Sequence, residues 1–193
     1  MTTTVGIVYE NGVVLAADQR ATMGSFIACR TAQKIHKIAP HIGFTIAGGV
    51  GDAQEIIRIL KSEVAIYAFR RGSPMRVSAM NALLSNFMNQ NRMVPYEVHP
   101  TLGGFDDTGP RLFTMDAIGG GSEEAAFSST GSGSPAALGL IEDTYDPGMS
   151  QNEAINLAVR SVATAKKRDA GSGEETVCVV IDEKGYRIVK EDK

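Results

Sequence analysis

This sequence lacks the features that would mark a membrane protein or a nucleic-acid-binding protein. Its longest apolar runs fall well short of the ~20 residues that a membrane-spanning helix needs. Acidic and basic residues nearly balance at a net charge of −3, so we expect neither nucleic acid nor a membrane as partner. No charged segment followed by an apolar stretch indicates a signal peptide, and we expect a cytoplasmic protein.

Metal-ligating residues are also scarce. Cys29 and Cys178 lie far apart in strand-like apolar surroundings, where we expect buried, reduced thiols. The three histidines show no metal-ligand spacing, and two cysteines cannot complete a zinc site. A phosphate-binding glycine loop with lysine is missing, and Gly131-Ser132-Gly133 lacks the spacing of a serine-hydrolase elbow. We therefore expect no metal and no cofactor.

The order of the predicted elements indicates the fold class. β-branched and apolar residues predict strands over 3–9, 13–18, 26–29, 34–38, 43–47, 98–105, 111–116, 125–129, 176–181 and 186–189. Helical spacing predicts two consecutive helices between residues 52 and 88 and two more between residues 134 and 168. Helix pairs between hairpins indicate antiparallel sheets covered by helical layers. We therefore expect a single α+β domain over residues 1–193.

Three of the predicted helices carry capping signals. Asp52 followed by Glu55 is typical of a capping box, and Ser73 before Pro74 is typical of a cap with a first-turn proline. Ser150 with its acidic residue three positions later predicts a reciprocal capping box.

The chain starts with three threonines, Thr2, Thr3 and Thr4, behind Met1. A threonine at a free chain start combines a nucleophilic hydroxyl with an α-amino group whose pKa of about 8 suits a general base. This chemistry requires removal of Met1. Such a start is common in proteins without this activity, so other segments must support the hypothesis.

Five further segments fit a threonine nucleophile, and each has an ordinary alternative. Asp18 and Arg20 either form a solvated ion pair or support Lys34, whose charge would disfavour protonation of a nearby amine. Asp169 and Ser172, three apart in a glycine-rich loop, either cap a helix or bind that amine. Segment 130–135 is typical of a turn between a strand and a helix. Segment 48–49 is typical of a helix start, where exposed backbone N–H groups could stabilise an oxyanion.

As a set, these segments resemble one family. The resemblance lies in Thr2-Thr3-Thr4-Val5-Gly6, Asp18-x-Arg20, Lys34, Thr45-Ile46-Ala47-Gly48, Gly51-Asp52-Ala53, Thr130-Gly131-Ser132-Gly133-Ser134 and Lys167-Arg168-Asp169. These residues are similar to those of the archaeal-type proteasome β subunit, in order and over essentially the whole chain. The resemblance implies an N-terminal nucleophile hydrolase fold, a four-layer αββα sandwich of two antiparallel sheets flanked by helix pairs.

The resemblance also implies the site residues. Thr2 would be the nucleophile and its amine the base, with Lys34 tuning both, and the supporting residues would be Asp18, Arg20, Gly48 for the oxyanion, Ser132, Asp169 and Ser172. The substrate pocket would be lined by Ala21, Ala32, His36, Ile46, Val50 and Gln54. Because most of this lining is small or apolar, we expect cleavage after bulky neutral residues.

The resemblance implies partners as well. These are a proteasome α-subunit ring, other β subunits in a heptameric ring, an ATP-dependent unfoldase acting through the α ring, and polypeptide substrates. Family members usually carry a propeptide before the threonine, which autocatalytic processing removes. Here only Met1 precedes Thr2, so either a propeptide was omitted or an aminopeptidase removes Met1. The alternatives are a non-catalytic structural β subunit and the bacterial two-ring ATP-dependent threonine protease.

Overall fold

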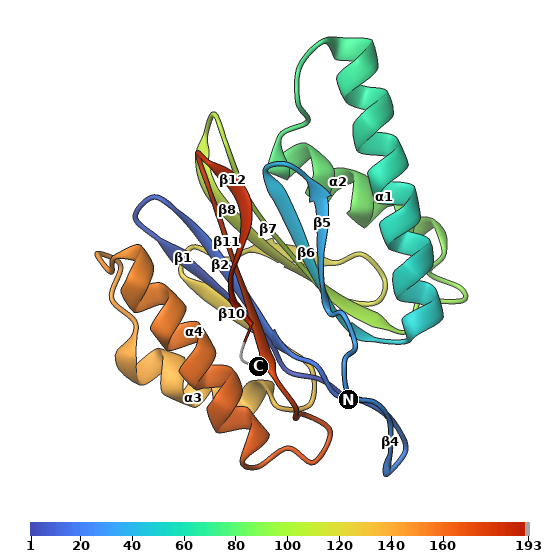
Figure 1. Cartoon of the computed structure of the whole chain (residues 1–193). Helices are drawn as coiled ribbons and strands as arrows, with labels where there is room; N and C mark the ends of the chain where they lie inside the picture. Colours follow the sequence, from blue (N-terminus) through green and yellow to red (C-terminus); the bar gives the residue numbers. More distant parts are fainter. Residues whose placement is uncertain (192–193) are drawn as a thin grey trace.

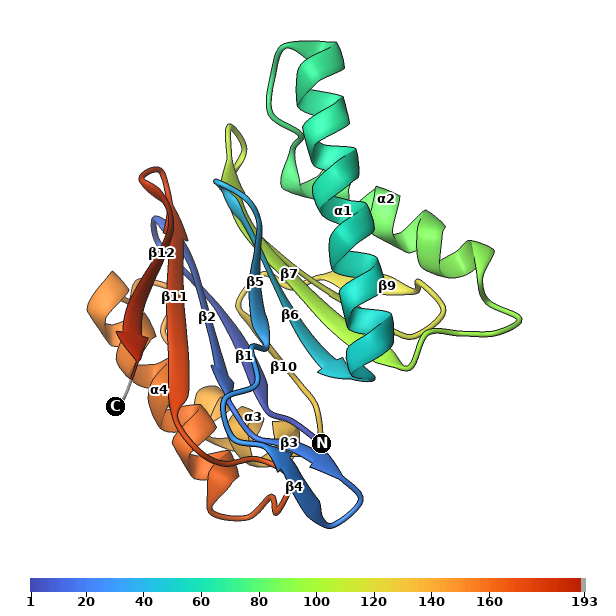
Figure 2. The same cartoon turned by 45° about the vertical axis from the view of Figure 1, so that its right-hand side comes forward.

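Four layers make up the fold in the computed structural model, which describes residues 1–191. Two five-stranded antiparallel sheets face each other, and each is covered on its outer face by two helices (Figure 1). Turning the molecule by 45° leaves the same order, with one helix pair on either side of the two sheets (Figure 2). The predicted αββα sandwich is therefore confirmed. Within the described residues, no helix is long and apolar enough to cross a membrane.

The first sheet contains the start of the chain. Its order is β10-β1-β2-β11-β12, made of β10 (Phe127–Thr130), β1 (Thr4–Tyr9), β2 (Gly12–Asp18), β11 (Thr176–Asp182) and β12 (Gly185–Glu191). The helices α3 (Ser134–Thr144) and α4 (Gln151–Lys166) cover its outer face. Alternation along β1 sends Val5 and Ile7 to this face, where they pack against Ile141 and Val162.

The second sheet follows the order β5-β6-β7-β8-β9. Its strands are β5 (Ile35–Ala39), β6 (Ile42–Gly48), β7 (Val98–Asp106), β8 (Gly109–Met115) and β9 (Gly121–Glu123). The helices α1 (Val50–Arg71) and α2 (Val77–Gln90) cover it. Phe44 of β6 is fully buried in one apolar cluster with Leu60 and Met80.

The inner faces of the two sheets pack closely, through an apolar cluster and through glycine. Leu15 and Val179 of the first sheet share a buried cluster with Leu112 of the second. A Cβ at Gly103 would lie 2.9 Å from Val13 and 3.1 Å from Leu15, so a larger residue there would push the sheets apart. The candidate site lies just before the start of β1 and at the end of β6.

Two of the three predicted helix starts are wrong. The N-cap of α1 is Gly49 and no side chain caps it; the Asp52 carboxylate instead accepts from the Glu97 N–H at 2.7 Å, which ties the helix to the segment before β7. Ser73 and Pro74 precede α2, which begins only at Val77. At the start of α2, the Val77 N–H donates to the Asp106 carboxylate at 2.8 Å, so in both helices a contact with a distant segment replaces the predicted local cap.

The third predicted start is confirmed. Ser150 caps α4, with the Ser150 N–H donating to the Glu153 carboxylate at 2.7 Å. A separate hairpin of β3 (Ala21–Met23) and β4 (Phe26–Cys29) extends from the end of the sandwich (Figure 2). Cys29 is exposed on this hairpin, so the prediction of two buried thiols is correct only for Cys178.

Candidate active site

Strand pairing brings the candidate residues to the start of the chain. In β1, Thr4 lies opposite Ala17 of β2 on one side and Thr130 of β10 on the other. Because both neighbours run antiparallel to β1, the residues that follow them, Asp18 and Gly131, lie beside the residues that precede Thr4. Thr2 is only 6% exposed there.

The turn after β10 wraps around Thr2. The Thr2 N–H donates to the Ser132 hydroxyl at 3.2 Å, and that hydroxyl donates to the Asp169 carboxylate at 2.7 Å. Gly131 has a φ of 95°, and a Cβ there would collide with the Thr2 carbonyl, so only glycine fits. The structure thus joins the Thr2 nitrogen to a carboxylate through one serine.

Asp169 is the centre of a second set of contacts. Its carboxylate accepts from the Ser172 hydroxyl at 2.5 Å and from the Gly171 N–H at 3.1 Å. Partial burial raises the pKa of Asp169, but hydrogen bonds from Ser172 and Ser132 outweigh it, so the pKa lies below its usual value. Asp169 is therefore an ionised acceptor at neutral pH.

Asp18 and Lys34 form a buried ion pair behind Thr2. The Lys34 Nζ lies 2.6 Å from Asp18 Oδ1, which also accepts from the Thr3 N–H at 2.9 Å. Asp18 Oδ2 accepts from the Gly173 N–H at 2.9 Å and the Arg20 N–H at 3.1 Å. Burial lowers the pKa of Lys34, and the attraction of Asp18 offsets part of that effect. Among the described residues, the structure records no direct hydrogen bond from Lys34 to Thr2.

Arg20 supports this pair indirectly. Its backbone N–H donates to Asp18, whereas its guanidinium donates to Glu174 Oε1 at 3.0 and 3.1 Å. A further bond of 3.1 Å reaches the Ala170 carbonyl. The side chain of Arg20 therefore joins the end of β2 to the loop that carries Asp169.

Gly48 ends β6 and lines the same cavity as Thr2. Its φ of 139° and the collision of an added Cβ with the Glu97 carbonyl make glycine necessary. The neighbouring Gly49 N–H already donates to that carbonyl at 2.7 Å. Of the two predicted oxyanion donors, only Gly48 therefore suits the role.

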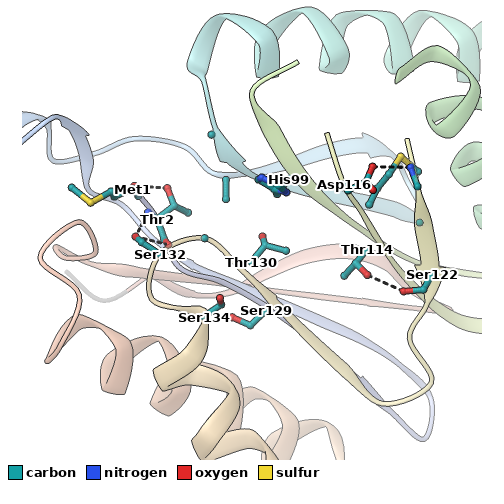
Figure 3. A pocket seen from close by; sticks show the side chains of 16 residues that line it. Met1, Thr2, His99, Thr114, Asp116, Ser122, Ser129, Thr130, Ser132 and Ser134 are labelled. Atoms are coloured by element: carbon teal, nitrogen blue, oxygen red, sulfur yellow. Dashed lines mark hydrogen bonds between the residues drawn. The ribbon is translucent and has the colours of Figure 1, made fainter. Parts of the chain in front are cut away.

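The cavity beside Thr2 has a volume of about 740 Å³. Thr2 and Ser132 lie at one end, and Asp116, Thr114 and Ser122 lie at the other, with His99 and Thr130 between them (Figure 3). Hydroxyl groups and glycine backbone form much of the wall. An extended peptide has both the space and the polar partners that it needs in this cavity.

The six predicted substrate-pocket residues do not line this cavity. Ile46 is buried against α1, Val50 and Gln54 lie exposed at the start of that helix, and Ala21 begins β3. Ala32 lines a separate cavity of about 250 Å³. The half-buried His36 has a lowered pKa because of burial and the charge of Lys61. Their grouping into one pocket stays a prediction.

Sequence reasoning missed three contributors to the site. The Thr3 hydroxyl lies 2.6 Å from the Ser172 hydroxyl, Gly173 donates to Asp18, and Glu174 holds Arg20. The Thr3 contact depends on strand register, which a single sequence shows poorly. Gly173 could have been noticed as part of a glycine-rich loop after a helix, but Glu174 carries no sequence signal.

The described residues contain no group of three or more histidine, cysteine, aspartate or glutamate side chains that could hold a metal ion. The chemistry that this arrangement can support therefore depends on the Thr2 hydroxyl, the nitrogen of Thr2, and the hydrogen-bonded carboxylates and lysine around them.

Comparison with known proteins gives a consistent result. The family described as "Proteasome subunit" matches residues 1–181. The "Proteasome subunit beta" of Methanoregula boonei is 52% identical over 191 residues, which is 99% of this chain and 90% of that protein. The proteins of the same description from Methanospirillum hungatei and Methanosarcina thermophila are 52% and 45% identical, covering 92% and 89% of their own lengths. The chain belongs to the proteasome subunit family, as a β subunit of the archaeal type.

Proposed function

We propose that this chain is a catalytic β subunit of the proteasome core particle, a threonine-type endopeptidase with Thr2 as its N-terminal nucleophile. One observation carries the proposal: the Thr2 nitrogen, the Ser132 hydroxyl and the Asp169 carboxylate form a continuous hydrogen-bonded chain beside a peptide-sized cavity. A subunit that only builds the ring has no need of this arrangement.

The reaction follows from these groups. The Thr2 hydroxyl attacks a peptide carbonyl while its own amine takes the hydroxyl proton, directly or through a water. The oxyanion that develops is stabilised by the Gly48 N–H. The amine returns the proton to the leaving nitrogen, an acyl ester remains on Thr2, and water attacks that ester to release the second product. Lys34 stays charged through Asp18 and disfavours protonation of the amine.

Met1 must be absent for this chemistry. With Met1 in place the Thr2 nitrogen belongs to an amide, which has no basic lone pair, and the Thr2 hydroxyl donates to the Met1 carbonyl at 2.6 Å. The same hydroxyl lies beside the bond that must break, so autocatalytic processing and an aminopeptidase are both chemically reasonable. Either route leaves an amine that can donate to Ser132.

Assembly is part of the proposal. The partners are a proteasome α-subunit ring, further copies of the β subunit in a heptameric ring, and an ATP-dependent unfoldase that delivers polypeptides through the α ring in the cytoplasm. In support, the surface of α1 and the loop after α2 expose large apolar side chains, among them Phe69 at 91% and Met93 at 87%. Single subunits rarely leave such side chains uncovered together.

The decisive experiment compares two assembled preparations that differ only in Met1, each verified by mass. Hydrolysis of a fluorogenic peptide should be confined to the form that begins with Thr2, because general-base assistance contributes about 10²–10⁴-fold in rate. Thr2→Ala in the processed background should be equally inactive. Equal activity with and without Met1 would refute Thr2 as the nucleophile and would favour the structural-subunit alternative.

A further inference from the structure

The loop that carries Asp169 and Ser172 ends at a residue with an unusual backbone. Glu174 has a φ of 62°, and it is the one residue other than glycine with a positive φ among those that the structure describes. The left-handed region costs a non-glycine residue about 1–2 kcal/mol. Such a conformation persists only where surrounding contacts stabilise it. The contacts of Glu174 therefore indicate its structural role.

The Glu174 side chain binds two cations from separate elements. Its Oε1 accepts from Arg20 at the end of β2 at 3.0 and 3.1 Å, and from Arg30 after β4 at 2.8 Å. The side chain is only 17% exposed, and hydrogen bonds from Arg30 and then Arg20 hold the pKa of this carboxyl below its usual value. Its main-chain carbonyl accepts from the Lys166 Nζ at 2.8 Å.

These contacts fix the neighbour of Glu174 against Asp18. The Gly173 N–H donates to Asp18 Oδ2 at 2.9 Å, and the Gly173 carbonyl accepts from the Gln19 N–H at 3.2 Å. A Cβ at Gly173 would collide with the Arg20 guanidinium, so Arg20 lies directly against this backbone. The Arg20 side chain thus contacts both Gly173 and Glu174. The same segment, through the Gly173 N–H, also orients Asp18.

We propose that Glu174 is a positioning residue for the threonine peptidase site: by holding Arg20, it keeps the loop 169–174 against the end of β2. That contact orients the Asp18 carboxylate toward Lys34 and the Ser172 hydroxyl toward Thr3. Glu174 touches neither Thr2 nor a substrate in this arrangement. The inference rests on the proposed function, because it concerns the geometry of that same site.

Two substitutions separate positioning from stability. Glu174→Gln keeps the length of the side chain and removes its charge. Glu174→Gly removes the side chain and also relieves the left-handed strain, so its thermal unfolding midpoint should equal or exceed that of Glu174→Gln. Glu175→Gln is the matched control, since it makes the same chemical change at the exposed next residue.

Peptide hydrolysis is measured on assembled particles in which Thr2 is the first residue by mass. We expect kcat to fall about 10- to 100-fold in both Glu174 variants, the size that small misplacements of catalytic groups produce, with KM within about twofold. Glu175→Gln should behave as the parent protein. The double variant Arg20→Gln/Glu174→Gln should lose no more kcat than the more affected of the two single variants, Arg20→Gln and Glu174→Gln. The reason is that both residues act through one contact.

The outcomes are distinguishable from those of the proposed function. If the parent protein shows no hydrolysis that depends on Thr2, the proposed function fails. If that hydrolysis is present but both Glu174 variants keep the parent kcat, the positioning role is refuted. Full activity of Glu174→Gly alone, or failure of both variants to assemble, would also overturn it, because Glu174 would then serve only the stability of the fold.

Discussion

The Nζ of Lys34 and Oδ1 of Asp18 lie 2.6 Å apart, with only 7% and 0% of their side chains exposed. Every other ion pair among the described residues has at least one partner more than 20% exposed. Burying two charges is costly unless each finds several partners, and Asp18 accepts three backbone N–H groups besides Lys34. These N–H groups offset the burial of Asp18, whereas burial still lowers the pKa of Lys34, so the remaining cost of the pair lies on the lysine.

Lys34→Met should abolish peptide hydrolysis and also destabilise the fold. Removing one partner of a buried pair leaves an uncompensated carboxylate at Asp18, which typically costs about 3–5 kcal/mol. Arg76→Met is the control, because it breaks an exposed pair with Asp107 that should contribute less than about 1 kcal/mol. Denaturant unfolding measures the stability change of each variant, and hydrolysis of a fluorogenic peptide measures the loss of activity. Parent activity in Lys34→Met would contradict the tuning role.

Thr2 and Thr3 should respond differently to one and the same substitution. Thr2→Val removes the nucleophile and should leave no measurable hydrolysis. Thr3→Val keeps the shape and removes a hydroxyl that lies 2.6 Å from Ser172, so it should cost about 1 kcal/mol of stability and less than tenfold in kcat. Fluorogenic peptide kinetics on both processed variants test this. Comparable losses in the two would mean that Thr2 holds no special role.

The layers were predictable from the sequence because they depend on local patterns. Alternating and continuous apolar runs marked strands such as β2, and helical spacing of Ile56, Leu60 and Val64 marked α1. The start of α1 was not predictable, since the Asp52 side chain binds Glu97, which is distant in the chain. A local capping pattern cannot reveal a competing tertiary acceptor or donor.

In the candidate site too, some features could be predicted from the sequence and others depend on tertiary contacts. Residue chemistry and the family resemblance together supplied Thr2, Asp18 and Lys34, and the structure brings the latter two together. It could not supply the contact between Arg20 and Glu174, which depends on a left-handed residue that glutamate rarely adopts. Contacts that arise from backbone strain and strand register appear only when the chain is seen folded.

Gly48→Ala should be far more damaging than Gly51→Ala. The added Cβ at Gly48 would collide with the Glu97 carbonyl at a φ of 139°, which forces the proposed oxyanion donor out of place. Gly51 lies in α1 with no atom within 4 Å of an added Cβ, so alanine there should stabilise the helix by about 0.5–1 kcal/mol. We expect kcat to fall by at least about 100-fold only in the first variant, and equal kcat values would contradict the oxyanion assignment.

The predicted substrate pocket can be tested by adding a charge. The parent protein should cleave after leucine or tyrosine in preference to arginine. Val50, exposed at the first position of α1, is a place where an acidic residue is compatible with the helix dipole. Val50→Glu should raise relative cleavage after arginine by about tenfold, and Val50→Gln should not. An unchanged preference in Val50→Glu would place Val50 outside the pocket.

Asp169→Asn should reveal a pH-dependent contribution to stability. The folded-state pKa of Asp169 lies below its ordinary value, mainly because Ser172 and Ser132 donate to it, so the ionised form stabilises the fold. This contribution is fully present above the ordinary aspartate pKa of about 3.9 and is lost as the pH falls from there through the lower folded-state value.

The difference in thermal unfolding midpoint between the parent protein and Asp169→Asn should therefore be largest near pH 6 and shrink steadily below about pH 4. Glu63→Gln, on the exposed face of α1, is the control and should change the midpoint little at any pH. Peptide hydrolysis by Asp169→Asn at neutral pH should also fall, because Ser132 loses its charged acceptor and no longer holds the Thr2 amine in one orientation. A constant midpoint difference from pH 6 to pH 3 would mean that the Asp169 contacts act through shape alone, and unchanged hydrolysis would remove Asp169 from the proposed mechanism.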